Sequence, residues 1–239
     1  MNQYIELLKS TPLLRRLSTI QLIAYFGAWF SNVAIYTLLL EMKVGGEIVA
    51  FVAMLHFLAG IIQAPISGAI ADKIEPKKLL LLLIATEALS TLALLMVRGE
   101  QELHLLYALI FIKMAAASFY FTVEMSILPK ILDSSKLQKA NELHSIIWSF
   151  SYTLGMALSG FVVYAFGVQT AFLLDAMLFL VSFYLLYTVE FSVQIEQNLT
   201  SPSRMMRQTI GYIKHSNKAF HLMMLHAFVG LTAFDALVA

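Results

Sequence analysis

The sequence predicts an all-α membrane protein, and its composition is the first reason. Apolar residues make up 59% of the 239 residues and charged residues only 13%, and the mean hydropathy is +0.78. A water-soluble fold of this size needs a polar surface that such a composition does not supply. The apolar residues also form runs of about 20 residues, the length at which one helix crosses the hydrocarbon core of a bilayer.

Composition and motifs also exclude several classes of function. The formal net charge of +1 argues against a nucleic-acid partner. The sequence has no cysteine, which excludes disulfides, thiol catalysis and thiolate metal sites. It has no P-loop, no HExxH zinc motif and no nucleophile with a plausible base. We therefore expect neither an enzyme nor a bound cofactor.

Seven apolar runs are predicted to cross the membrane. They are separated by charged or turn-forming residues at Glu41 to Glu47, Asp72 to Lys78, Arg98 to Glu102, Pro129 to Glu142, and Gly167 to Gln169. The predicted spans are 17–40, 47–71, 79–97, 104–128, 143–166, 171–189 and 219–239. The first is too long to be a signal-peptide core, so we expect it to remain in the mature protein. The short connection after the fifth span predicts a helical hairpin.

Lysine and arginine lie mostly on one side of the predicted membrane. The opposite side has only Lys43 and Arg98, and Lys113 lies inside a span. Because positive loops remain in the cytoplasm, residues 1–16 are predicted to be a cytoplasmic N-terminal segment. The residues on the basic side are Lys9, Arg15, Arg16, Lys73, Lys77, Lys78, Lys130, Lys136, Lys139, Arg204, Arg207, Lys214 and Lys218.

Residues 190–218 are the one long polar segment, and we expect a cytoplasmic linker there. Ser201 suits a helix N-cap, and Pro202 suits the first helical position. The residues that follow have one apolar face and several positive charges, which predicts an amphipathic basic helix at the lipid interface. A solvated linker with a basic bias fits equally well. Residues 219–239 then form the seventh span, and the pattern as a whole is that of half of a larger protein.

The loop after the second span carries the most distinctive motif. Five of the seven residues from Asp72 to Lys78 are charged. Asp72 follows the C-terminal end of a predicted helix, where the helix dipole disfavours an anion, so it needs a cationic partner. An ordinary solvated turn is the alternative. The residues of this motif are Gly68, Asp72, Lys73, Lys77 and Lys78.

This motif resembles the loop that major facilitator superfamily transporters have between their second and third helices. Further matches favour the drug:proton antiporter branch similar to macrolide and enterobactin exporters: they are Glu75, Gly27-Ala28-Trp29, Ile127-Leu-Pro129, Leu137, Ala140-Asn141, and Phe172-Leu-Leu-Asp175-Ala176. The departures from that branch are Ala28, Pro76 and Met156.

The resemblance implies a fold of two six-helix halves with the substrate held between them. Residues 17–189 would then be the six-helix N-terminal bundle of the major facilitator fold. The cytoplasmic linker and the first helix of an absent C-terminal half would follow. In the family, the loop aspartate latches the two halves together, which is the role expected of Asp72.

The function implied by the resemblance is secondary active transport in the bacterial inner (plasma) membrane. We expect a proton-coupled exporter of lipophilic or amphipathic small molecules that works by alternating access. Its partners would be membrane lipids, the small-molecule substrate, protons and the missing C-terminal half. Export of a lipid or siderophore is a variant of this hypothesis. The alternative is a truncated or non-transporting membrane protein that needs a partner half.

Ionisable residues inside spans are candidates for proton coupling, because each costs about 3 kcal/mol or more at bilayer depth. Glu87 and Lys113 are both predicted near the midplane, where they could form an ion pair that stabilises the bundle. The resemblance implies another role, in which Lys113 replaces the fourth-span arginine of the proton-antiporter motif. In that motif the cation tunes the pKa of a nearby carboxylate that carries protons. Asp175 could cap the hairpin or be proton-linked, and Asp235 lies deep in the seventh span. Glu124 could pair with Lys130 or with the Asp72 loop.

Aromatic residues of the first and fourth spans are candidates for a substrate cavity. These helices line the cavity in the superfamily, and an aromatic, weakly polar wall would suit lipophilic substrates. Core or lipid-facing positions are the alternative. The candidates are Tyr25, Trp29, Asn32, Tyr36, Phe119 and Tyr120.

Small residues at intervals of four predict flat helix faces that allow close packing in lipid. One stripe consists of Gly60, Ala64, Gly68 and Asp72 in the second span. The other consists of Ser151, Gly155 and Ser159 in the fifth span, where we expect static contacts within the bundle.

Overall fold

The computed structural model describes residues 2–71, 73–191, 202–218 and 220–225. In these residues every secondary-structure element is a helix. The chain divides into two compact units, residues 1–196 and 197–239, and each is described by itself. The elements are α1 (Asn2–Ser10), α2 (Pro12–Glu41), α3 (Gly46–Ala71), α4 (Pro76–Leu94), η1 (Glu100–Glu102), α5 (Leu103–Ile131), α6 (Ser134–Phe166), α7 (Val168–Tyr187) and α8 (Pro202–His215).

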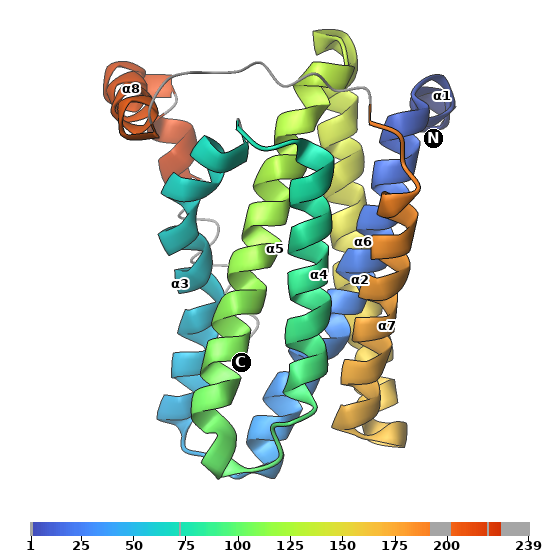
Figure 1. The fold of residues 1–239 in the computed structure, drawn as a ribbon, viewed down its shortest axis with the longest axis vertical. Coiled ribbons are helices and arrows are strands. Elements are labelled where there is room, and N and C mark those ends of the chain that lie inside the picture. Colours follow the sequence, from blue (N-terminus) through green and yellow to red (C-terminus); the bar gives the residue numbers. More distant parts are fainter. Residues whose placement is uncertain (1, 72, 192–201, 219, 226–239) are drawn as a thin grey trace. The chain divides into compact units, whose positions relative to one another are not determined.

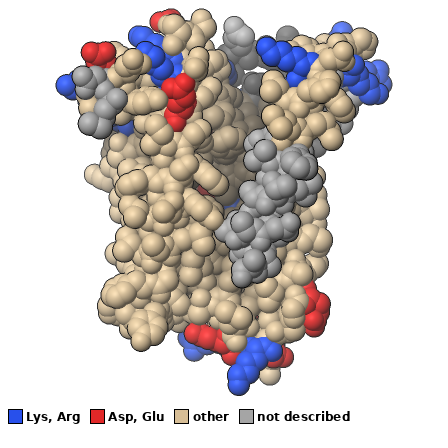
Figure 2. Space-filling view, turned by 180° about the vertical axis from the view of Figure 1, so that it is seen from behind, with Lys and Arg blue, Asp and Glu red and all other residues tan. Residues whose placement is uncertain are grey.

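Helices α2 to α7 correspond to the first six predicted spans. Five helical segments of the described chain are long and apolar enough to cross a membrane: Pro12–Glu41, Gly46–Ala64, Glu100–Ile131, Ser134–Phe166 and Val168–Tyr187. Helix α4 has only 19 residues and includes Lys77, Lys78 and Glu87, so it has no long stretch free of these charges. Figure 2 shows charged side chains at the two ends of the bundle and a wide surface almost without them in between. The chain therefore forms an all-α, multi-pass membrane fold.

The second unit begins its described part at Pro202, the residue predicted to start the linker helix. Helix α8 ends at His215, and residues 220–225 are also helical. Most of the predicted seventh span lies outside the described residues. The interfacial role of α8 and the seventh span both stay predictions.

The connection between the fourth and fifth predicted spans is much shorter than expected. The sequence predicts a break from Pro129 to Glu142, but α5 continues through Pro129 to Ile131 and α6 begins at Ser134. Pro129 lies in the last turn of α5, where a proline disturbs few later hydrogen bonds. The polar start of α6 is helical because its apolar side packs on a small cluster formed by Leu7, Leu14, Leu128, Leu132 and Ala140.

The bundle has a simple order of neighbours. Helix α2 packs against α6 and α7, α4 packs against α5 and α7, and α3 packs against α5. These helices run side by side along the vertical axis of Figure 1. The α6–α7 hairpin turns at Gly167, whose φ of 83° is a conformation that side chains rarely permit.

Two apolar clusters fill the bundle, one above the other along the helices. The first apolar cluster is built mainly from Leu17, Ile20, Ala24, Leu80, Ile84, Val123, Ile127, Phe179 and Leu186. The second apolar cluster is built mainly from Phe30, Ala34, Leu39, Val52, Leu94, Leu106, Ile110 and Phe172. On each of α2, α4, α5 and α7, a short interval separates the residues of one cluster from those of the other. Lys113 and Asp175, two of the proton-coupling candidates, lie at this level.

The small-residue face of α6 packs closely against α2, and a glycine permits this approach. Ser151, Gly155 and Ser159 are all buried. A Cβ atom on Gly155 would lie 2.9 Å from the Cβ of Trp29. The hydroxyl of Ser159 donates a hydrogen bond of 3.1 Å to the carbonyl oxygen of Phe30. These contacts agree with the static role expected for this face.

The other predicted small-residue stripe, on α3, packs closely against a neighbouring helix at only one of its positions. A Cβ on Gly60 would lie 3.1 Å from the hydroxyl oxygen of Ser118 on α5, whereas Gly68 has no atom within 4 Å of such a Cβ. Ala64 and Gly68 are exposed. Asp72 lies outside the described residues. The stripe therefore packs against α5 at Gly60 and is open further along.

We predict that Gly155→Ala destabilises the bundle by about 1–3 kcal/mol, because the new methyl group forces α2 and α6 apart. The measurement is the thermal unfolding of the intact protein in detergent, followed by fluorescence-detected size exclusion. Gly160→Ala is the matched control, since a Cβ there meets nothing within 4 Å on the same helix. Equal melting temperatures for the two variants would contradict the close packing described here.

Candidate functional site

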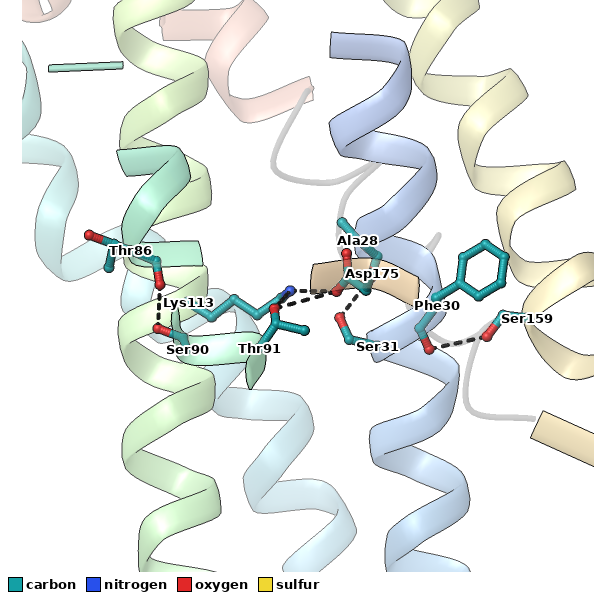
Figure 3. Close-up of polar contacts among 9 residues, drawn as sticks. All are labelled: Ala28, Phe30, Ser31, Thr86, Ser90, Thr91, Lys113, Ser159 and Asp175. Atoms are coloured by element: carbon teal, nitrogen blue, oxygen red, sulfur yellow. Dashed lines mark hydrogen bonds and ion pairs between the residues drawn. The ribbon is translucent and has the colours of Figure 1, made fainter. Parts of the chain in front are cut away.

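Lys113 of α5 and Asp175 of α7 form an ion pair inside the bundle (Figure 3). The distance from Nζ to Oδ2 is 2.8 Å, and the side chains are 2% and 0% exposed. Nζ also donates a hydrogen bond of 2.5 Å to the hydroxyl oxygen of Thr91 on α4. The same ammonium group lies 4.5 Å from the ring centroid of Phe179. One cation thus connects three helices.

The ion pair lies at the level between the two apolar clusters. On α2, this level is occupied by Gly27, where a Cβ would lie only 2.8 Å from Oδ1 of Asp175. The absence of a side chain on α2 therefore leaves the space that the carboxylate occupies. Oδ1 is buried and accepts no hydrogen bond from the described residues. We call Gly27, Thr91, Lys113 and Asp175 the polar layer.

The structure corrects the expected partner of Lys113. The sequence predicts an ion pair with Glu87, but the ammonium group pairs with Asp175 instead. Glu87 is buried on α4, and no hydrogen bond or ion pair joins it to Lys113 in the described part of the chain. Thr91 lies about one turn further along α4 and takes the position facing the ammonium group. Asp175 does not cap the hairpin, because it lies about two turns after the start of α7.

The charged loop between α3 and α4 lies at the surface. Lys78 forms an ion pair with Glu75, with 2.8 Å between Nζ and Oε2, and this hydrogen bond and charge raise the pKa of Lys78. Nζ of Lys77 lies 5.7 Å from the ring centroid of Tyr187 on α7. Asp72 lies outside the described residues, so its role as a latch stays a prediction. The other motif members, Gly68 and Lys73, are exposed.

Two predicted cavity residues of α2 meet an aromatic row on α6. The ring centroid of Trp29 lies 4.6 Å from that of Tyr152 and 6.2 Å from that of Trp148, both in edge contacts. Tyr25 makes an edge contact of 5.9 Å with His144. The α6 residues were not predicted from the sequence, although their spacing of four places His144, Trp148 and Tyr152 on one helix face.

The other predicted site residues are scattered. Tyr36 is half-buried and stacks on His56 of α3 with ring centroids 5.9 Å apart. Tyr120 is only 2% exposed and belongs to the first apolar cluster, so it lines no open space. Asn32 and Phe119 are half-buried. Asp235 lies outside the described residues.

The described residues offer no group of three or more His, Cys, Asp or Glu side chains that could hold a metal ion. The buried ionisable groups of the described residues are instead one ion pair and single carboxyl groups inside an apolar bundle. Such groups can bind and release protons or interact with a charged ligand. They are typical of ion and substrate pathways in membrane proteins.

Comparison with known sequences gives one family and two curated relatives. A family model described as Major Facilitator Superfamily matches residues 17–239. The chain is 27% identical over 168 residues to the uncharacterized MFS-type transporter YfiS of Bacillus subtilis (strain 168), covering 70% of this chain and 40% of that protein. It is 26% identical over 129 residues to the uncharacterized MFS-type transporter YkuC of the same organism, covering 54% and 30%.

A solved structure shares the fold. The in meso crystal structure of the POT family transporter PepTSo matches with a TM-score of 0.68 and 16% sequence identity. The match covers 95% of this chain and 48% of that one. At such low identity the likeness concerns the fold alone. The chain thus spans less than half the length of each of these relatives.

We predict that Lys113→Met destabilises the protein by about 3–5 kcal/mol, because it leaves the carboxylate of Asp175 buried without its cation. The double variant Lys113→Met/Asp175→Leu should recover most of the loss, since two apolar side chains leave no charge unpaired. Melting temperatures of the wild type, both single variants and the double variant measure this coupling. A double variant no more stable than Lys113→Met would contradict it.

Proposed function

Because this chain belongs to the major facilitator superfamily, we propose that it works in a secondary transporter that exports lipophilic or amphipathic molecules in exchange for protons. Substrate would bind between two six-helix halves, and movement of one half against the other would give alternating access. The family match and the names of both curated relatives support transport rather than catalysis. The basic residues on one side support a cytoplasmic N-terminus, and the bacterial source of both curated relatives supports a location in the bacterial inner (plasma) membrane.

The observation that carries the proton-coupling proposal is the buried ion pair of Lys113 and Asp175. A proton that binds Asp175 cancels its charge and leaves the ammonium group of Lys113 without a counter-ion. Glu87 lies close enough to interact electrostatically with Lys113, so it offers a second acidic partner on a different helix. Protonation would thereby change which helices the cation holds together. This is the link between proton binding and conformation that an antiporter requires.

The aromatic contacts between α2 and α6 support an apolar substrate. Trp148 is 48% exposed and stacks on Tyr152 with an interplanar angle of 3°. Flat, half-exposed rings favour ligands that offer aromatic or aliphatic surface. The proposed partners are accordingly membrane lipids, such a substrate, protons, and a C-terminal six-helix half whose contact with the Asp72 loop closes the cytoplasmic side.

Dye efflux from cells that express the intact protein tests the proposed function. We expect efflux that stops when an uncoupler collapses the proton gradient. Asp175→Asn, Lys113→Ala and Glu87→Gln should each reduce efflux towards the level of cells without the protein, because each removes a group of the proposed proton pathway.

The matched control for this experiment is Glu100→Gln, which removes an exposed carboxylate from η1 and should leave efflux unchanged. The coupling assignment fails if all three buried-site variants retain uncoupler-sensitive efflux. No efflux from the wild type would favour the alternative, a membrane protein that does not transport by itself.

We also predict that Trp148→Ala raises the half-saturating dye concentration about 2- to 10-fold, because one aromatic contact contributes about 0.5–1.5 kcal/mol. The measurement is the initial rate of efflux against dye concentration. Phe161→Ala is the control on the same helix, since Phe161 is a similarly exposed ring outside the aromatic row. Equal half-saturating concentrations for the two variants would remove the aromatic row from the substrate path.

A further inference from the structure

Glu124 is a buried carboxyl group that the ion pair of the polar layer does not use. It lies on α5, about two turns before the helix ends at Ile131. Its side chain is 3% exposed, and Oε2 has no hydrogen-bond partner in the described part of the chain. The sequence suggests a pair with Lys130, but Lys130 is exposed and forms no ion pair with it. A carboxylate buried in this way, without a cation, is costly.

Glu124 lines a small cavity between α2, α5 and α6. The cavity has a volume of about 10 Å³, which is room for one water molecule. Its polar lining consists of Ser18 and Gln21 from α2, Glu124 from α5 and His144 from α6. A buried water needs two to four polar partners, and this lining provides that number.

The imidazole of His144 is held in place on the far side of this cavity. The side-chain amide of Gln21 hydrogen-bonds its Nδ1, and the amide nitrogen lies 3.3 Å from Nε2. The rings of Tyr25 and Phe121 flank it, with centroids 5.9 and 5.2 Å away. Imidazole is the side chain that accepts and releases protons most readily near neutral pH. A carboxyl and an imidazole thus face one water-sized space.

The remaining titratable groups near Glu124 come from the helices that line its cavity, α2, α5 and α6. They are Tyr25 of α2, Tyr120 of α5 and His144 of α6. No lysine or arginine of the described chain forms an ion pair with Glu124. Its charge therefore depends on water and protons rather than on a fixed cation.

Tyr120 adds another buried polar atom to α5. Its hydroxyl is buried and has no hydrogen-bond partner among the described residues. It lies about one turn before Glu124 on α5, and Lys113 lies about three turns before Glu124 on a similar face. Glu87 is buried on the neighbouring helix α4. The polar groups between Glu124 and the polar layer thus follow one side of α5.

We propose that Glu124 and His144, bridged by one water, form a proton-binding site separate from the Lys113–Asp175 pair. A hydronium ion gives its proton to an oxygen of Glu124, which leaves a neutral carboxyl and a water molecule. On release, the proton passes through the bridging water to a ring nitrogen of His144, and the imidazolium then returns it to bulk water. The inference rests on the proposed function, because the orientation given there makes this the cytoplasmic side.

The test is infrared spectroscopy of the intact protein in lipid nanodiscs across a pH titration. The wild type should show the carbonyl absorption of a buried protonated carboxyl, and this band should disappear as the pH rises. Because Glu87 is a second buried carboxyl group, the comparison is made in a Glu87→Gln background. There we expect Glu124→Gln to lack the band and Glu190→Gln, which removes an exposed carboxylate, to keep it. His144→Asn should move the pH at which the band disappears.

An unchanged band in Glu124→Gln overturns the inference. If that variant does not fold, Glu124→Asp keeps an acid at the position and should shift the band in frequency; an unshifted band again overturns the proposal. The spectra do not depend on transport. If efflux is insensitive to the uncoupler but the Glu124 band is present, the proposed function is contradicted and the Glu124 site is supported. If efflux is driven by protons but the band is absent, the proposed function is supported and the Glu124 site is contradicted.

Discussion

The bundle depends on one buried cation. Lys113 connects α4, α5 and α7 through Thr91 and Asp175, while apolar residues surround it above and below. In lipid there is no water to replace these partners, so each helix must keep its rotation and height for the ammonium group to remain paired. A slip of one residue would turn a helix by about 100° and remove its contribution. The polar layer therefore fixes the register of the apolar clusters on either side.

Hydropathy predicts the helices well because the bilayer imposes a length on each span. The positions of Lys113 and Asp175 inside spans also identify them as unusual, but the sequence does not show which acid the lysine meets. Glu87 and Thr91 differ by only about one turn of α4, and the choice between them depends on how four helices are rotated. Pairing is thus a property of the assembled bundle, which no single span encodes.

The contacts of the aromatic residues could not be predicted from a single span either. Tyr25 and Trp29 are recognisable as candidates because they lie on the first span, but their partners on α6 come more than a hundred residues later. Their contact depends on the close approach of the two helices at Gly155. The connection after Pro129 is shorter than expected for a related reason: a proline in the last turn interrupts little, and tertiary packing on Leu7 and Leu14 keeps the polar start of α6 helical.

The packing of α1 against α6 means that the position of α1 can report on the movement of α6. Leu7 lies in a cluster with residues of α2, α5 and α6, and the hydroxyl of Tyr4 donates a hydrogen bond of 3.0 Å to Glu142 of α6. Helix α1 is thereby attached to the polar extension of α6, beyond the predicted membrane boundary. A spectroscopic label on the exposed side of α1 would follow the tilt of α6 without any chemical change inside the bundle.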